Sequence, residues 1–521
     1  MDFVHESHYQ FVFMMRCYYT SIRSASGVLR MNESPIDSSL FTAAQCKAID
    51  RLAIESLPIP GYQLMCRAAR SANHWITRLF PKACSFNVVC GAGNNGGDGL
   101  ALAKLLFESG HSVTVTLADS GFEEKLAGEA LEAWNDLPAE LSKTLFDCSV
   151  EDESDLIVDA LLGIGLSGEV RPDSAAIIDW MNQQPSPVFA LDIPSGLSAD
   201  TGSVLGSAVK ADATLTFIAS KQGLFIGQAR DYVGKVLVDG LGVPTDLFPE
   251  SYCELISEPL NQLATLNRYA HKGSQGSLVV IGGDVGFGGA PILSSEAALR
   301  TGAGRVTLLT HCKSAVTAML SRAPEVMVRL TNEIDHFESM ILSMDAIAIG
   351  PGLGQGDWAL ACLDRVKGLD KPTVVDADAL NLIAQGRVRF HANAVFTPHP
   401  GEASRLLGCK VTDIQSDPIG AAFSLQRKLS GVIVLKGAGS IVCDGQKAFV
   451  CNLGNPGMAT AGMGDLLSGI IATFLAQGYS LKDSAQMGVW LHAKAGDMAS
   501  AEGERGLIAT DLLPHIRSLI G

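Results

Sequence analysis

The sequence predicts an α/β protein with two domains, each built around a mostly parallel β-sheet. Short apolar runs typical of buried strands alternate with helical patterns, which is the order that βαβ units produce. Glycine-rich segments follow several of these runs, and the 521 residues include 54 glycines. The alternation is lost between Gly240 and Thr265, so we expect one domain over residues 36–250 and a second over residues 251–521.

The first 35 residues differ from the rest, and we expect them to form a disordered leader. Asp2 and Glu6 contradict the basic segment of a signal peptide, and the apolar run Phe11–Met15 is too short for one. Met31 is an alternative start of the protein.

Composition and charge exclude several classes of protein. The net charge of −16 argues against nucleic acid as the main partner, because phosphates require a basic face. The twelve cysteines form no C-x-x-C motif, which argues against a zinc ribbon and favours reduced thiols in the cytoplasm. No apolar run reaches the roughly 18 residues of a membrane span. We expect a cytoplasmic protein and a homo-oligomer, with no nucleic-acid or membrane partner.

The first domain opens with a helix that Thr42 is placed to cap, with apolar residues at Ala43, Cys46, Ile49 and Ala53. A second helical pattern follows the turn Pro58–Gly61. The remaining expected elements are strand Asn87–Cys90, helix Leu100–Phe107, strand Ser112–Leu117, helix Glu123–Trp134 and strands Leu156–Ala160, Val188–Leu191 and Ala213–Ile218.

The sharpest motif of this domain is the segment GAGNNGGDG, which begins at Gly91 directly after a strand. Gly91, Gly93 and Gly96 match G-x-G-x-x-G, whose glycines let backbone N–H groups approach a phosphate at a helix N-terminus. A turn without a ligand is the alternative, but the polar side chains within the segment exceed what a turn needs. Asp119 ends the next strand, where an NAD dehydrogenase places a ribose-binding acid. The long polar loop argues against that enzyme class.

Two further strands end in acids, Asp159 and Asp192. Ligands of open parallel sheets bind beyond the carboxyl ends of the strands. Asn95, Asp159 and Ser195 are therefore candidates to hold one cation through oxygen atoms. The alternative for each strand-end aspartate is simple capping of the following helix.

The segments GAGNNGGDG, DALLGIGLSGEVR and LDIPSGLSADTG resemble the NAD(P)H-hydrate epimerase domain of the bifunctional NAD(P)H-hydrate repair enzymes. The resemblance implies a Rossmann-like fold, K⁺ on Asn95, Asp159 and Ser195, and Asp192 as the acid and base. Inversion at the hydroxyl-bearing carbon is open to ring opening or to hydroxide loss. The substrate residues that the resemblance implies are Asn94, Asn95, Gly96, Gly97, Asp98, Gly163, Ile164, Gly165, Leu166, Ser167, Gly168, Glu169 and Asp192.

The second domain repeats the alternation of strands and helices. Asp444-Gly445 predicts a hairpin between Ile441–Cys443 and Ala448–Cys451, and helices Asp465–Gln477 and Leu481–Ser500 follow. The expected parallel strands are Ser277–Ile281, Arg305–Leu309, Ala346–Ile349, Thr373–Val375, Ala394–Thr397 and Val432–Leu435.

Glycine-rich loops follow three strands of this domain, and the one before Asp465 carries the most chemistry. Gly462–Gly464 place backbone N–H groups at a helix N-terminus, which suits a phosphate. Asp465 is then placed to take a proton from an attacking hydroxyl, or else it caps the helix. Lys436–Ser440 is either a nucleotide-contacting loop or an ordinary turn, and His399 is more typical of a rigid turn than of a catalyst.

The segments HKGSQGS, GPGLG, VDADAL, FTPHPGE, LKGAGS and GNPGMATAGMGD resemble the ADP-dependent NAD(P)H-hydrate dehydratases of the ribokinase-like superfamily. The resemblance implies Asp465 as the base, Mg²⁺ together with ADP, and substrate contacts at Ala290, Gly352, His399 and Asp465. It implies ADP binding by Lys436, Gly437, Ala438, Gly439, Ser440 and Gly464.

The two resemblances together predict a metabolite-repair enzyme with hydrates of NADH and NADPH as substrates. The first site would equilibrate the R and S epimers, and the second would dehydrate the S epimer with ADP, giving AMP and phosphate. The alternative is a ribokinase-like vitamin kinase fused to a nucleotide-binding or scaffold module.

Overall fold

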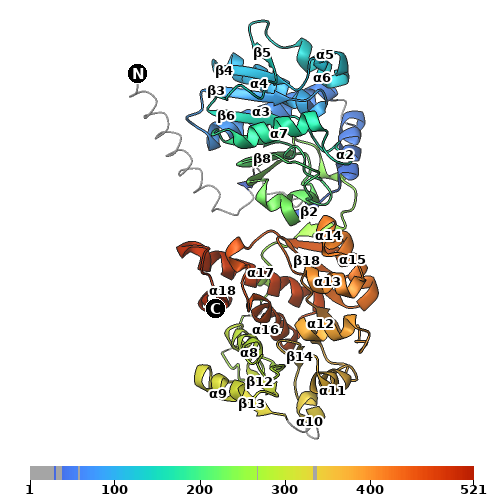
Figure 1. The fold of residues 1–521 in the computed structure, drawn as a ribbon, viewed down its shortest axis with the longest axis vertical. Helices are drawn as coiled ribbons and strands as arrows, with labels where there is room; N and C mark the ends of the chain where they lie inside the picture. Colours follow the sequence, from blue (N-terminus) through green and yellow to red (C-terminus); the bar gives the residue numbers. More distant parts are fainter. Residues whose placement is uncertain (1–28, 31–37, 57–58, 264, 267, 332–336) are drawn as a thin grey trace. The chain divides into compact units, whose positions relative to one another are not determined.

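The computed structural model describes residues 29–30, 38–56, 59–263, 265–266, 268–331 and 337–521. Apart from Leu29–Arg30, the expected leader lies outside the described residues. The chain divides into two compact units, Met1–Ser251 and Tyr252–Gly521, called here the N-terminal and C-terminal units. Each unit is α/β, as the sequence predicts (Figure 1).

The N-terminal unit contains an all-parallel sheet in the order β1-β9-β8-β7-β6-β3-β4-β5. Its strands are β1 (Leu29–Arg30), β3 (Ser85–Cys90), β4 (Ser112–Leu117), β5 (Ser142–Leu145), β6 (Leu156–Ala160), β7 (Val188–Leu191), β8 (Ala213–Phe217) and β9 (Lys235–Asp239). Its α-helices are α2 (Ala43–Ser56), α3 (Gly61–Leu79), α4 (Asn94–Glu108), α5 (Phe122–Lys125), α6 (Gly128–Asn135) and α7 (Pro172–Gln183).

Helices cover both faces of this sheet because its strands are apolar on both sides. Val88 and Cys90 of β3 belong to the cluster that packs against α2, α3, α4 and α6. Val89, between them in the sequence, belongs to a second cluster that includes Ile177 and Ile178 of α7. This period of two is the side-chain alternation of a strand.

Two expected helices have different bounds in the structure. Helix α4 begins at Asn94, six residues before the expected start at Leu100, because the glycines pack inside the helix instead of forming a loop. A Cβ atom at Gly96 would lie 1.6 Å from the Gly91 carbonyl oxygen, and one at Gly99 would lie 2.5 Å from the Ala160 Cβ. The expected helix Glu123–Trp134 is broken into α5 and α6, and Gly128 has a φ of 52° at the restart.

The C-terminal unit contains a mixed sheet in the order β13-β12-β11-β14-β15-β16-β17-β18-β19-β10. Only β18 runs antiparallel to its neighbours, and the expected hairpin is confirmed by the pairing of Cys443 with Ala448. The strands are β10 (Cys253–Leu255), β11 (Ser277–Ile281), β12 (Arg305–Thr310), β13 (Met327–Leu330), β14 (Ala346–Ile349), β15 (Thr373–Val375), β16 (Ala394–Phe396), β17 (Val432–Leu435), β18 (Ser440–Cys443) and β19 (Ala448–Cys451).

Helix α16 lies at the centre of this unit and is buried along nearly its whole length. It packs closely on α8, where a Cβ atom at Gly469 would lie 2.1 Å from the Ser294 carbonyl oxygen. The α-helices are α8 (Gly289–Arg300), α9 (Lys313–Arg322), α10 (Phe337–Leu342), α11 (Asp357–Val366), α12 (Ala377–Ala384), α13 (Pro400–Leu407), α14 (Val411–Ser416), α15 (Pro418–Leu429), α16 (Met463–Ala476), α17 (Leu481–Ala499) and α18 (Leu512–Ile520).

Both sheets reverse their strand order once, and each reversal places two glycine-rich loops side by side. In the N-terminal unit the chain runs from β3 out to β5 and returns to β6, on the other side of β3. In the C-terminal unit it runs from β11 out to β13 and returns to β14. Such reversals open a crevice at the carboxyl ends of the strands, which is where α/β proteins bind ligands.

Candidate active sites

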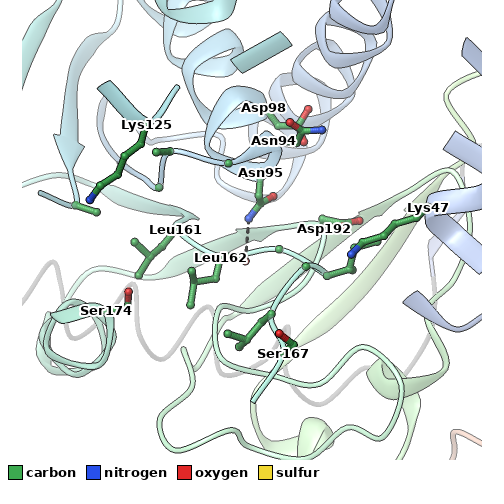
Figure 2. A pocket seen from close by; sticks show the side chains of 18 of the residues that line it. Lys47, Asn94, Asn95, Asp98, Lys125, Leu161, Leu162, Ser167, Ser174 and Asp192 are labelled. Carbon is green, nitrogen blue, oxygen red and sulfur yellow. Dashed lines mark hydrogen bonds between the residues drawn. The ribbon is translucent and has the colours of Figure 1, made fainter. Parts of the chain in front are cut away.

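A cavity of about 710 Å³ opens at the strand reversal of the N-terminal unit (Figure 2). Its walls are the start of α4, the loop after β6, the ends of β7 and β8, and one face of α2. Of the residues expected to bind substrate, those on the cavity wall are Asn94, Asn95, Asp98, Gly163, Ile164, Gly165, Leu166, Ser167, Glu169 and Asp192.

Three of the residues expected to bind substrate do not line the cavity. Gly96 and Gly97 are buried within α4, where a Cβ atom at Gly97 would lie 2.5 Å from the Met65 side chain. Gly168 has a φ of 81°, so it shapes the loop that carries Ser167 and Glu169. These glycines support the site through the backbone and packing.

Asn95, Asp159 and Ser195 lie together beneath the cavity wall. The Ser195 hydroxyl donates to Asp159 Oδ1 (2.6 Å), and the Ser195 N–H donates to Asp159 Oδ2 (2.7 Å). Asn95 Nδ2 donates to the Leu162 carbonyl oxygen (3.0 Å), as the dashed line in Figure 2 shows. Burial raises the pKa of Asp159 to about 6, although its bonds with Ser195 oppose the rise.

The amide oxygen of Asn95 gives this cluster its binding capacity. Asn95 Oδ1 is buried and has no hydrogen-bond partner among the described residues. A buried polar atom without a partner is costly, and a cation would satisfy it. Amide, hydroxyl and carboxylate oxygens are ligands for a hard cation, so the three residues fit the expected potassium site.

Asp192 forms a buried ion pair with Lys221, which follows the neighbouring strand β8. Lys221 is only 2% exposed, and its Nζ also donates to the Phe217 carbonyl oxygen (2.9 Å). Burial opposes the charge of Lys221, but Asp192 and other nearby acidic groups raise the pKa of its ammonium above the ordinary value. Asp192 has a φ of 64°, a left-handed conformation that an aspartate tolerates better than most residues.

Sequence reasoning did not find Lys221, Cys46 or Asp50 as parts of this site. Cys46 and Asp50 lie on the same helix face as Ile49 and Ala53, and an acid on a buried face was an available signal. Lys221 comes four residues after β8. The expectation that site residues follow the carboxyl ends of strands, which selected Asp159 and Asp192, would have found Lys221 if it had been extended to basic residues. Burial raises the pKa of the Cys46 thiol to about 11.

The C-terminal unit has a corresponding ion pair between Asp376 and Lys436. Asp376 Oδ1 accepts from Lys436 Nζ (2.8 Å), and Asp376 Oδ2 accepts from the Ser468 hydroxyl of α16 (2.7 Å). Burial opposes the charge of Asp376, but Lys436 and Ser468 hold the pKa of this carboxyl below its ordinary value. Asp376 follows β15 directly, a strand-end acid for which the sequence reasoning proposed no role.

Asp465 lies in the first turn of α16, beside this pair. Gly462 caps the helix with a φ of 91°, and a Cβ atom at Gly464 would lie 3.2 Å from Lys436 Nζ. Burial raises the pKa of Asp465 to about 7, and Asp376 adds to the rise while Lys436 opposes it. The N-terminus of α16, the Lys436 ammonium and the Asp465 carboxyl therefore lie close together. Phosphoryl transfer uses such a set, with positive groups around the phosphate and a carboxylate that accepts the proton of the attacking hydroxyl.

The other expected residues surround this centre on different loops. His399 caps α13, since its Nδ1 accepts from the Gly401 N–H (3.0 Å) and its backbone N–H donates to Glu402 Oε2 (2.9 Å). Lys436–Ser440 is the turn between the antiparallel strands β17 and β18. Ala290 is the second residue of α8, and the Gly352 carbonyl oxygen accepts from the Gly283 N–H (2.9 Å) across the strand reversal.

Sequence reasoning also missed Glu402 and His492. Burial raises the pKa of Glu402 to about 7. Burial and Lys436 lower the pKa of His492, on α17, to about 4. His492 Nε2 is buried without a partner within the described part of the chain.

Two other kinds of site are absent from the described residues. No group of three His, Cys, Asp or Glu residues there is arranged to hold a metal ion. No helix in the described ranges is long and apolar enough to cross a membrane.

Comparison with known proteins gives matches to both units. Residues 61–223 match the family model described as YjeF-related protein N-terminus, and residues 278–518 match the one described as NAD(P)H-hydrate dehydratase. The bifunctional NAD(P)H-hydrate repair enzyme of Coxiella burnetii is 45% identical, and the alignment covers 92% of this chain and 99% of that one. The enzyme of the same name from Vibrio cholerae is 41% identical, with 93% and 99% covered.

Among solved structures, the chain is similar to the ADP/ATP-dependent NAD(P)H-hydrate dehydratase from Bacillus subtilis, which was co-crystallised with ATP and Mg²⁺. That protein is 26% identical, with a TM-score of 0.46, and the alignment covers 51% of this chain and 96% of that one.

The ion pair of the N-terminal unit gives a first prediction, which concerns stability. Lys221→Met should destabilise this unit by about 3–5 kcal/mol, because it leaves the Asp192 carboxylate buried without its partner. Adding Asp192→Asn should recover a large part of that loss. Urea denaturation of both single variants and the double variant would give the coupling free energy. Lys47→Met, at an exposed lysine of the cavity rim, is the control; a Lys221→Met protein as stable as the unchanged chain would contradict the prediction.

Proposed function

Since the chain belongs to the family of bifunctional NAD(P)H-hydrate repair enzymes, we propose that residues 36–250 are its epimerase domain and residues 251–521 its dehydratase domain. The alignments cover nearly the whole length of the two relatives, so we assign both activities to this chain. The observation that carries the assignment is that the two family matches fall on different units, and each unit holds a buried Asp–Lys pair at a strand end.

In the N-terminal unit, the substrates are the R and S hydrates of NADH and NADPH. The hydrate carries a hydroxyl on the carbon beside the ring nitrogen, and proton transfer to or from that hydroxyl permits inversion. Asp192 is the acid and base of this step, and Lys221 fixes its position. The N-terminus of α4 presents backbone N–H groups to a phosphate of the dinucleotide, so the acidic unit can still bind an anion.

Asn95, Asp159 and Ser195 hold a potassium ion in this proposal. The ion supplies a positive charge next to the loop that carries Gly163–Glu169. This chain's own contribution is to hold that loop at Leu162, whose carbonyl oxygen accepts from Asn95 Nδ2 (3.0 Å) and whose N–H donates to Ser195 Oγ (2.7 Å).

In the C-terminal unit, ADP binds at the turn Lys436–Ser440 and at Gly464, and the S hydrate binds near Ala290, Gly352 and His399. Asp465 takes the proton from the substrate hydroxyl as the β-phosphoryl group of ADP is transferred to its oxygen. AMP is released by this transfer. The C–O bond then breaks, phosphate leaves with the bonding electron pair, and the neighbouring ring carbon gives up a proton to solvent, which restores the C=C bond of the nicotinamide ring.

Mg²⁺ is proposed to accompany the nucleotide, where it would offset the charge of the phosphates. Asp376, Asp378 and Glu402 lie close enough to interact with Asp465 electrostatically. Mg²⁺ in such sites is held by phosphates and one or two carboxylates, so this set of oxygen donors fits the ion.

The location and assembly of the protein complete the proposal. The cysteines that the structure describes are free thiols, which supports a reducing compartment such as the cytoplasm. A homo-oligomer remains a prediction, and sedimentation of the purified chain would test it.

The assignment predicts the outcome of one incubation. Purified protein with mixed hydrates of NADH, ADP and Mg²⁺ should restore the absorbance of NADH until both epimers are consumed, with one AMP and one phosphate formed per NADH. Chromatography of the epimers and nucleotides measures each product. Persistence of the R epimer would contradict the epimerase assignment, and accumulation of a phosphorylated product would indicate the alternative kinase.

Asp465 gives a prediction specific to the second site. Asp465→Asn should reduce dehydration of the S hydrate by about 10²-fold or more, because a positioned base is lost. In the unchanged chain, dehydration should rise as the pH increases through about 7, since the base acts as the carboxylate. Epimerisation by the same Asp465→Asn chain is the internal control. A dehydration rate that is unchanged in the variant would contradict the role of Asp465.

The potassium site predicts a dependence on monovalent cations. Replacing KCl by choline chloride should lower both the epimerisation rate and the thermal unfolding temperature of the N-terminal unit, because the buried oxygens lose their cation. Asn95→Leu should abolish the response of the unfolding temperature, whereas Asn95→Asp, which keeps an oxygen ligand, should retain it. An equal response in all three proteins would show that Asn95 holds no cation.

A further inference from the structure

Asp50 is a carboxyl group on the wall of the epimerase cavity for which nothing above provides a role. It lies on α2, half-buried, on the face that also carries Cys46, Ile49 and Ala53. Its side chain makes no hydrogen bond and no ion pair with any described residue. The Asp50 carboxyl lines the cavity and is therefore open to a ligand there.

The groups around Asp50 come from four elements. Asp192 follows β7, Lys221 follows β8, Asp98 lies on α4, and Cys46 and Lys47 lie on α2 itself. Lys221 already forms its ion pair with Asp192, so Asp50 and Asp98 share no other buried ammonium among the described cavity residues. The inner end of the cavity therefore holds three carboxyl groups and one ammonium.

These neighbours set the protonation of Asp50. Burial raises the pKa of Asp50 to about 6; Asp192 adds to the rise, and Lys221 opposes it. Burial raises the pKa of Asp98 well above its ordinary value, and Asp192 and Asp50 add to the rise while Lys221 opposes it. The Cys46 thiol, with a pKa of about 11, stays protonated. Asp50 is thus able to give up and regain a proton near neutral pH.

We propose that Asp50 is a second catalytic carboxyl of the epimerase site and that it works together with Asp192. The inference rests on the epimerase activity proposed above. Asp50 and Asp192 reach the cavity from different elements, α2 and the end of β7. One carboxyl can therefore protonate the departing hydroxyl while the other accepts a proton from the incoming water.

Protonated Asp50 donates to the hydroxyl on the carbon beside the ring nitrogen, the C–O bond breaks, and its electron pair leaves with the water. The lone pair of the ring nitrogen forms a C=N⁺ bond. A water molecule then adds to the other face of that carbon and gives its proton to the Asp192 carboxylate. The reverse inversion uses the same two groups with their roles exchanged.

The charge of the cavity favours this route over ring opening. Once Asp50 has donated its proton, a carboxylate faces a positively charged ring, and the two charges attract at short range. Opening the ring to a neutral aldehyde would gain nothing from this arrangement. The same acidic cluster that would disfavour a negative intermediate therefore stabilises a positive one.

The test is a comparison of four forms of the full chain with the R hydrate alone. Asp50→Asn should lower the epimerisation rate by about 10²-fold, whereas Asp50→Glu, which keeps an acid, should retain much more of it. Glu55→Gln removes a carboxyl from the exposed end of the same helix and should have no effect. Dehydration of the S hydrate by each variant reports that the chain is intact.

The pH profile separates a catalytic role from a structural one. In the unchanged chain, epimerisation should decline as the pH rises above about 6, because Asp50 must be protonated to donate. This decline should be absent in Asp50→Asn. In water labelled with ¹⁸O, each inverted molecule should carry the label on its hydroxyl.

Three results would overturn the inference: a normal rate in Asp50→Asn, a reduced rate with an unchanged pH profile, or inverted product that keeps its original oxygen. Failure of the proposed function would look different, because the unchanged chain would then leave the R hydrate unaltered at every pH.

Discussion

The structure of both sites depends on one interaction, a buried lysine paired with an aspartate at the carboxyl end of a parallel strand. Lys221 joins Asp192 in the N-terminal unit, and Lys436 joins Asp376 in the C-terminal unit. In each case the lysine follows a different strand from the aspartate, so the pair connects two strand ends. An unpaired charge in either place would be strongly destabilising, and the pair therefore fixes the geometry around the cavity floor.

Glycines provide the second constraint, because they let the loops at the two strand reversals approach each other. A Cβ atom at Gly91 would lie 2.0 Å from the Leu161 carbonyl oxygen, and one at Gly282 would lie 2.0 Å from the Pro351 carbonyl oxygen. Each glycine directly follows the first strand beside the reversal. Any side chain there would force apart the two loops that form the binding crevice, so close backbone approach is part of the site in both units.

The sequence was sufficient to predict the central strands and the acids that follow them. Strands such as β7, β11 and β14 are uninterrupted apolar runs, and buried parallel strands produce that pattern. The edge strand β5 was missed because its four residues are exposed and mostly polar. The start of α4 was misplaced because glycine normally ends a helix, whereas here its lack of a side chain permits packing on β3 and β6.

The partners of the site residues were harder to predict because they are distant in sequence. Asp192 is recognisable as a strand-end acid, but nothing local identifies Lys221, 29 positions away, as its counter-ion. Asp50 precedes both in the sequence, and strands β3 to β7 lie between it and Asp192. The local sequence pattern predicts where the crevice lies. Only the folded structure shows which charged side chains line it together.

The two units also share an arrangement in which one acid is paired and another is not. In the C-terminal unit, Lys436 and Ser468 occupy Asp376, which leaves Asp465 without an ion pair and with a pKa of about 7. In the N-terminal unit, Lys221 occupies Asp192 and leaves Asp50 with a pKa of about 6. Burial raises the pKa of the second carboxyl in each unit, and the single buried lysine opposes that rise without cancelling it. Proton transfer is efficient near neutral pH, and burial beside a lysine that is already paired places both carboxyls in that range.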